Sequence, residues 1–190
     1  MSYGYRLNVE QLMLKNANEK WLKALERFTI LNDSSPEDGA AFTINAPAIH
    51  DEDTISLCIE AVLGWAISTE AFVNLAWQTC PDTKGVNERK YKTIEKVKFL
   101  CKVNGINYGT LPWRDNISEL FNLRNSLVHY KTPITYVGFG FITKYQRDLS
   151  QGQMVKYQGA VTKLINELGG RLDMSVDFTS GDYELFYYSV

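Results

Sequence analysis

Arg124, Asn125 and His129 are the residues of this sequence whose types and spacing best suit chemistry on a phosphate. An arginine is a permanent, fork-shaped donor that matches the oxygens of a phosphate group. A histidine side chain titrates near pH 6.5, so it can give or take a proton at neutral pH. His129 follows Asn125 by four positions, which puts amide and imidazole on one side of a helix. This set suits the binding of a phosphodiester and proton transfer around it.

The stretch that must position these groups, residues 113–131, predicts an amphipathic helix. Wound at about 100° per residue, its apolar side chains fall within about a third of the circumference. Arg124 projects into the middle of that stripe, where an unpaired guanidinium would cost several kcal/mol. We therefore expect a carboxylate partner or a wet cleft beside it; a core-facing arginine satisfied by a carboxylate is the simpler alternative. The stripe consists of Ile117, Leu120, Phe121, Leu127 and Val128.

Four further segments predict helices, over residues 7–31, 54–79, 88–103 and 151–168. Residues 54–79 are apolar nearly all the way round, which is typical of the central buried helix of a bundle. Glu70, Asn74 and Gln78 form one polar stripe along it at a spacing of four. Glu70 or Glu60 is the candidate counter-ion of Arg124, although both glutamates could simply reach the edge of the bundle.

The segments between these helices carry clear breaks. Residues 32–39 are dense in turn formers, and Gly169-Gly170 is expected to stop the last helix. Beside His50 the acidic residues 51–53 invite a metal interpretation, but the chain has only one other histidine. We therefore expect Asp53 to cap the helix that begins near Thr54. Residues 134–148 predict a short extended insertion or hairpin. The tail 174–190 holds five aromatic residues and is expected to dock on the bundle or on a second subunit.

Composition indicates one globular domain over residues 1–190, with 45% hydrophobic and 22% charged residues. Its expected core spans 54–168, with an N-terminal helix and loop over 1–53. Three isolated cysteines argue against a disulfide framework and a structural zinc site, which favours a cytoplasmic protein. No signal peptide opens the chain, and the most apolar segment carries Glu60 and Glu70, so no membrane partner is expected.

The formal net charge of −2 bears on possible partners. Non-specific nucleic-acid binders are usually basic, because neutralised phosphates supply most of their affinity. Any RNA partner would therefore meet a local patch or a small pocket. The best phosphate-attracting face is a lysine row in the third helix, although such rows are more often plain solvated surface. The row consists of Lys90, Lys92, Lys96, Lys98 and Lys102.

Arg124-Asn125 followed by His129 resembles the R-x4-6-H signature of the HEPN superfamily, in which the residue after the arginine is commonly Asn, Asp or His. The motif alone is weak and gains weight from the helices around it. The stretch Glu70-Ala-Phe-x-Asn74 also looks like the first core helix of many HEPN proteins. The resemblance covers residues 54–168. It implies an all-α, up-and-down helical bundle of four to five helices, here with the extended insertion and the aromatic C-terminal tail.

As a HEPN-like protein, the chain is expected to be a metal-independent endoribonuclease, for example a toxin or defence effector. The products would carry 2′,3′-cyclic phosphate and 5′-hydroxyl ends, and neither cofactor nor metal is implied. His129 would act as base or acid and Arg124 would hold the phosphate, with Asn125 orienting the histidine or touching phosphate. Ser126 and Tyr130 are secondary candidates. One chain lacks a second titratable group, so the resemblance implies a homodimer with a composite site.

Some HEPN toxins pair with a nucleotidyltransferase antitoxin that modifies a tyrosine two places after the histidine. Lys131 stands at that place here and Tyr130 is adjacent to the histidine, so this regulatory partner is in doubt. The competing hypothesis is a non-catalytic HEPN-like module that binds a nucleotide or a protein and uses Arg124 structurally. The acidic balance of the chain supports it. A purely structural bundle of a larger assembly is a third possibility.

Overall fold

The structure of the chain is a computed structural model that describes residues 3–6, 8–33, 51–129, 144–174 and 186–189. Five long helices make up most of it: α1 (Val9–Asp33), α3 (Glu52–Thr79), α4 (Thr93–Val103), α5 (Arg114–Val128) and α7 (Gln151–Leu172). Shorter elements are α6 (Lys144–Asp148) and the 3-10 turns η1 (Pro81–Thr83), η2 (Glu88–Lys90) and η3 (Tyr108–Thr110). The all-α prediction is therefore confirmed at the level of fold class.

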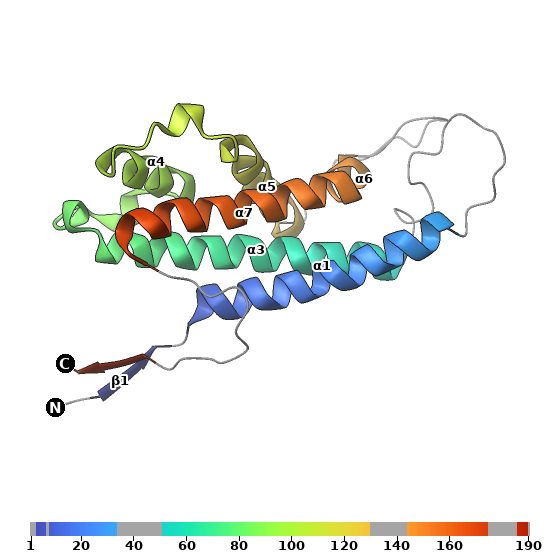
Figure 1. Cartoon of the computed structure of the whole chain (residues 1–190), viewed down its shortest axis with the longest axis horizontal. Coiled ribbons are helices and arrows are strands. Elements are labelled where there is room, and N and C mark those ends of the chain that lie inside the picture. The colour runs from blue at the N-terminus through green and yellow to red at the C-terminus, as the bar shows by residue number, and fades with distance from the viewer. Residues whose placement is uncertain (1–2, 7, 34–50, 130–143, 175–185, 190) are drawn as a thin grey trace.

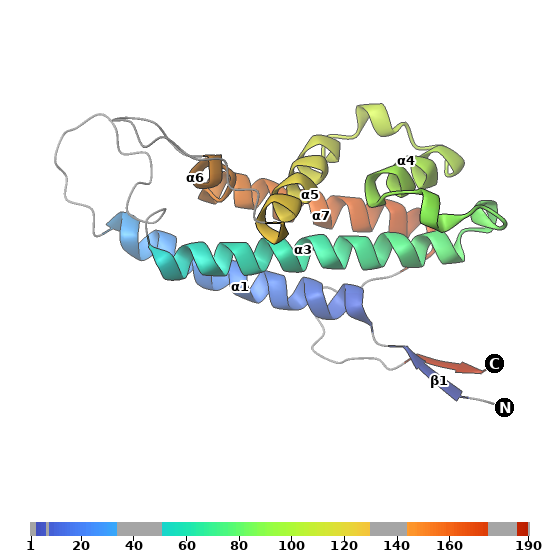
Figure 2. The same ribbon diagram turned by 180° about the vertical axis from the view of Figure 1, so that it is seen from behind.

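The helices α1 and α3 form the long base of the bundle, and they run side by side in opposite directions (Figure 1). Helix α7 packs along α3, and α5 packs against both α3 and α7 (Figure 2). The close approach of α1 to α3 needs small residues. A Cβ atom added at Gly64 would lie 2.8 Å from the Cβ of Ala17, so the glycine lets the two backbones come together.

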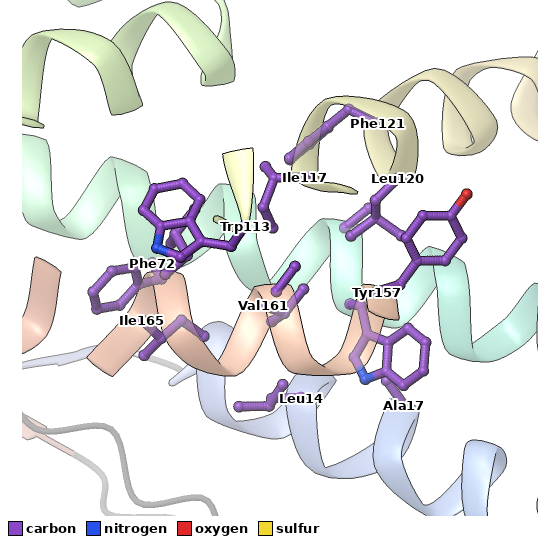
Figure 3. Packing of buried hydrophobic residues seen from close by; sticks show 14 of the residues in the cluster. Leu14, Ala17, Phe72, Trp113, Ile117, Leu120, Phe121, Tyr157, Val161 and Ile165 are labelled. Atoms are coloured by element: carbon purple, nitrogen blue, oxygen red, sulfur yellow. The ribbon is translucent and has the colours of Figure 1, made fainter. Parts of the chain in front are cut away.

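Helix α3 is the centre of the hydrophobic core. Among the described helices it is the one long and apolar enough to span a membrane, but half of its most apolar stretch is buried inside the bundle. Such burial is typical of a core helix. Figure 3 shows four of the core side chains packed together: Phe72 of α3, Trp113 at the N-cap of α5, Ile117 within α5 and Val161 of α7. The core is therefore built across α3, α5 and α7, and it continues into α1.

The first turn of α3 is capped by a different aspartate from the one expected. The carboxylate of Asp51, at the N-cap position, accepts a hydrogen bond from the Thr54 backbone N–H at 2.8 Å and another from the Thr54 hydroxyl. Arg27 of α1 also donates to Asp51 from Nε and Nη2, both at 3.0 Å. The prediction of Asp53 was wrong by two residues, and Asp53 instead forms an ion pair with Arg27 at 3.0 Å.

Replacing Asp51 by alanine is expected to lower the free energy of unfolding by about 0.5–2 kcal/mol at pH 7. Hydrogen bonds from Thr54, aided by Arg27, hold the pKa of Asp51 below its usual value of 3.8. A lowered folded-state pKa adds stability that is present above pH 3.8 and is lost as the pH falls through the folded-state pKa. In urea unfolding, the difference between wild type and variant should therefore be constant well above pH 3.8 and shrink as the pH falls below it.

Asp51→Asn is the matched control, because asparagine caps helices about as well as aspartate but carries no charge. It should retain most of the stability at pH 7 and lose the acid dependence. A gap between Asp51→Ala and wild type that is the same at pH 7 and pH 3 would show that the carboxylate charge contributes nothing.

The end of α7 also differs from the sequence prediction. Gly169-Gly170 does not stop the helix, which continues to Leu172 and ends at Asp173 with a positive φ of 53°. Gly169 is required for another reason, since a Cβ atom there would lie 2.6 Å from the carbonyl oxygen of Met174. The returning backbone donates from the N–H of Met174 to the carbonyl of Gly169 at 2.8 Å. The glycine therefore makes room for the chain leaving the helix.

The other expected segments are described only in part. The helix expected over 88–103 is divided into η2 and α4. Of the 134–148 insertion the structure describes residues 144–148, and these form the helical turn α6 rather than an extended strand. In the aromatic tail, β2 (Phe186–Ser189) pairs antiparallel with β1 (Tyr3–Arg6), in the register Tyr3 to Ser189. Both strands project away from the bundle at the N-terminal end of α1 (Figure 1).

All three cysteines are buried, and none of them forms a disulfide. Burial raises the pKa of Cys58 to about 12 and, with the nearby Glu167, that of Cys101 to about 11. At neutral pH both groups are therefore neutral thiols that serve as small apolar core residues.

Candidate functional site

The motif helix α5 is shorter than the 113–131 segment that the sequence predicted. It ends at Val128, and His129 is its C-cap, with its backbone N–H donating to the Asn125 carbonyl at 3.1 Å. The side chain of His129 is exposed. Arg124 lies five residues earlier, which is about 7.5 Å along the helix axis. Both groups therefore sit in the last two turns of α5, and both reach solvent.

By its angle on the helix Arg124 falls within the buried stripe of α5, as predicted, but it comes after Leu123, the last buried residue of the helix. The residues of α5 that are buried are Ile117, Leu120, Phe121 and Leu123, whereas Val128 is 54% exposed. The stripe is thus buried only as far as Leu123, and the guanidinium beyond it is 29% exposed. The predicted desolvation penalty is correspondingly small, because the group keeps contact with water.

Glu70 of α3 is the carboxylate that lies beside Arg124. Its Oε2 is 3.8 Å from Arg124 Nη2, and 42% of the glutamate side chain is exposed. Arg124 Nη1 also donates to Asn125 Oδ1 at 3.0 Å. A half-exposed pair at this distance adds at most about 1 kcal/mol of stability, so its main effect is to hold the guanidinium in place. Glu60 lies elsewhere, and it pairs with Lys20 of α1 at 2.5 Å.

A pocket of about 580 Å³ lies beside Arg124, between α3, α5 and the first turn of α4. Its lining includes three cationic side chains, Lys92, Lys96 and Arg124, and two carboxylates, Glu70 and Glu95. The remaining residues supply hydroxyl, amide, aromatic and aliphatic groups: Tyr91, Thr93, Ile94, Ser118, Phe121, Asn122 and Asn125. Lys96 is also paired with Glu88, so Lys92 and Arg124 are the cations of the lining that a small anion carrying an organic group would meet.

The lysine row does not form one continuous face, since its middle member is buried. Lys96 is 8% exposed, and its Nζ donates to Asn74 Oδ1 at 2.7 Å and to Glu88 Oε1 at 2.6 Å. Asn74, a predicted site residue, therefore holds a lysine of α4. Lys98 lies over the ring of Tyr108 at 5.5 Å. The expectation that Lys96 belongs to a solvated or RNA-contacting row is corrected: it ties α4 to α3.

The remaining candidates have different positions. Ser126 is half-buried and its hydroxyl donates to the Asn122 carbonyl at 3.0 Å, within α5. Tyr130 and His50 lie outside the described residues. Within the described ranges, no group of three or more His, Cys, Asp or Glu side chains gathers as a metal site.

Sequence reasoning placed Asn125 and His129 on one side of α5 but missed that Ser118 and Asn122 extend this polar face, of which Ser118, Asn122 and Asn125 line the pocket and His129 does not. Ser118, Asn122, Asn125 and His129 recur at intervals of four, three and four, which places them on one strip of the helix. The N-terminal turn of α4 was also missed as a pocket wall. The sequence feature that marks the start of α4 is Glu95, three residues after Lys92. Its carboxylate accepts a hydrogen bond from the Lys92 backbone N–H at 2.7 Å.

The site therefore consists of a pocket of about 580 Å³ with the Arg124 guanidinium in its wall, and an exposed imidazole outside that wall at the end of the same helix. No protein-family model matches the chain, and no curated protein or solved structure is significantly similar to it.

Proposed function

We propose that the chain is a metal-independent endoribonuclease of HEPN type that acts in the cytoplasm. The observation that carries the proposal is the position of Arg124 and His129 at the solvent-accessible end of α5, with Arg124 lining a pocket of about 580 Å³. A phosphate in that pocket would meet the guanidinium and the ammonium of Lys92. The exposed imidazole remains available for proton transfer.

The reaction needs a base, an acid and a cation. The base removes the proton of the ribose 2′-hydroxyl, whose oxygen then attacks the phosphorus. The bond from phosphorus to the 5′-oxygen breaks, and the acid returns a proton to that oxygen. Arg124 stabilises the charge that gathers on the phosphorus oxygens. The products are a 2′,3′-cyclic phosphate and a 5′-hydroxyl, as the HEPN resemblance implies.

A single His129 cannot be base and acid in the same step, so the proposal includes a homodimer. Two copies of α5 facing each other across a two-fold axis would bring two imidazoles to one crevice. Val128, an apolar residue 54% exposed directly before His129, supports contact between copies at this end of the helix. Size-exclusion chromatography with light scattering should give a mass near twice 21.7 kDa.

The second candidate is a non-catalytic module that binds a nucleotide or a protein. It is favoured by the contacts of Arg124 to Glu70 and Asn125, which already occupy the guanidinium. A nucleotidyltransferase or other antitoxin as partner is an expectation of the resemblance alone.

Incubation of the purified chain with single-stranded RNA in excess EDTA tests the two candidates. We expect fragments whose 3′ ends are 2′,3′-cyclic phosphates and whose 5′ ends accept a phosphate from polynucleotide kinase without prior dephosphorylation. Intact RNA at every enzyme concentration would overturn the nuclease proposal. Binding of mononucleotides without cleavage, lost in Arg124→Ala, would establish the alternative.

A further inference from the structure

A second pocket, of about 380 Å³, lies on the other side of α5, against α6 and the start of α7. Asn122 of α5 lines both pockets, so this side chain stands on the ridge between them. A cavity of this size falls in the range of about 300–1,000 Å³ that small organic ligands occupy. A ligand spanning the ridge would therefore place different groups in the two pockets.

The lining of the second pocket is more acidic than that of the first. Its lining carries two carboxylates, Glu119 and Asp148, and one guanidinium, Arg147. The side chain of Asp148 is 13% exposed, and its Oδ1 accepts from Arg147 Nε at 3.3 Å. Glu119 accepts from Gln153 Nε2 at 3.0 Å. Because acceptors outnumber cations, the pocket repels a phosphate and suits a neutral group that carries N–H donors.

The inner wall is formed by two buried side chains, the aliphatic Leu123 and the aromatic Tyr157. Tyr157 is 1% exposed and Leu123 is also 1% exposed, so a planar ligand would contact both on entering the pocket. Figure 3 shows Tyr157 beside Leu120, with the phenol oxygen at the edge of the packed cluster. Burial, with Asp148 and Glu119 nearby, raises the pKa of Tyr157 to about 12, so the hydroxyl keeps its proton. The 73% exposed side chain of Arg147 lies at the rim and can cover a base face.

Among the four RNA bases, guanine fits these features best. Its N1–H and N2 amino group are adjacent donors that match the two oxygens of one carboxylate, whereas cytosine and adenine offer one amino group each and uracil one N–H. Single-stranded RNA is commonly read through unstacked bases held in this way. Resting on the proposed function, we propose that this second pocket binds a guanine base, next to the phosphate held by Arg124.

Guanosine binding to the whole protein tests this inference without a cleavage step. Titration followed by NMR should show at least about tenfold weaker binding of adenosine, cytidine and uridine than of guanosine. Asp148→Asn should abolish the preference, because the amide replaces one acceptor oxygen by a donor. Glu119→Gln is the second variant, chosen at an exposed position so that it folds even if Asp148→Asn does not. It should weaken the preference for guanosine. Asp115→Asn, 78% exposed on the same helix, is the control and should bind as wild type.

The outcomes separate this inference from the proposed function. Equal binding of the four nucleosides, binding of none at millimolar concentration, or binding of spermidine in their place would overturn the guanine pocket. RNA cleavage without any preference for guanosine next to the cleaved bond would also overturn the guanine pocket, but it would leave the nuclease proposal intact. Selective guanosine binding by a chain that does not cleave RNA would support the guanine pocket and overturn the nuclease proposal.

Discussion

His129→Ala is expected to reduce RNA cleavage about 10²–10⁴-fold, because it removes the proposed proton-transfer group from both subunits of the dimer. Arg124→Ala should reduce cleavage about 10²–10³-fold by removing the donor that stabilises charge on the phosphorus oxygens. Initial rates on one fluorescent RNA substrate in EDTA measure both losses. Rates are compared at saturating RNA so that weakened binding does not contribute.

Both losses should occur in folded protein. His129 is exposed and Arg124 forms one half-exposed ion pair, so each variant should unfold within about 1 kcal/mol of wild type. Arg171→Ala, an exposed arginine in the last turn of α7, is the matched control and should cleave as wild type. Full activity of folded His129→Ala would remove the histidine from the mechanism. Full activity of folded Arg124→Ala would remove the arginine.

Glu70→Gln distinguishes a guanidinium that acts on phosphate from one that only satisfies its neighbour. The amide keeps a hydrogen-bond acceptor near Arg124 but removes the competing negative charge. If Arg124 binds phosphate, the variant should bind RNA at least as tightly as wild type. If Arg124 only forms the ion pair with Glu70, RNA binding should not change, while the free energy of unfolding should fall.

The sequence predicted the helices well because apolar periodicity depends on the core they bury. Helix α3 was recognised as central from its uniform apolar character, and it lies against α1, α4, α5 and α7. Helix ends were predicted less accurately, since they depend on single contacts. Asp51 caps α3 in place of Asp53 because Arg27 of α1, distant in sequence, also holds the Asp51 carboxylate. Spacing alone gave no sign of that arginine.

The candidate site was predictable only where it lies on one helix. The helical position of Arg124 indicated that it needs a carboxylate, and Glu70 is the one beside it. Burial of Lys96 could not be predicted, because a lysine row looks the same whether or not Asn74 and Glu88 surround its middle member. Pockets are likewise formed by elements far apart in sequence. The two beside α5 need α4 in one case and α7 in the other.

Trp65→Ala should have the largest effect on stability, a loss of about 3–5 kcal/mol in the free energy of unfolding. Trp65 of α3 is fully buried, and its ring centroid lies 6.3 Å from that of Trp21 in α1. Its Nε1 donates at 2.9 Å to Asn18 Oδ1, which also accepts from Gln158 of α7 at 3.2 Å. The indole therefore joins three helices, and the alanine leaves a cavity that their packing cannot close. Urea unfolding followed by circular dichroism measures the loss.

Two further variants divide this loss into its causes. Trp65→Phe keeps much of the apolar contact and removes the indole N–H, so it should cost less than Trp65→Ala. Leu22→Ala, 55% exposed on α1, is the control and should change stability by less than about 0.5 kcal/mol. A loss in Trp65→Ala no larger than in Leu22→Ala would contradict the packing of α1 on α3. Domains are stable by only about 5–15 kcal/mol, so the packing of this one indole is a large share of the total stability. It helps to hold α3 in place, and with α3 the Glu70 carboxylate that pairs with Arg124.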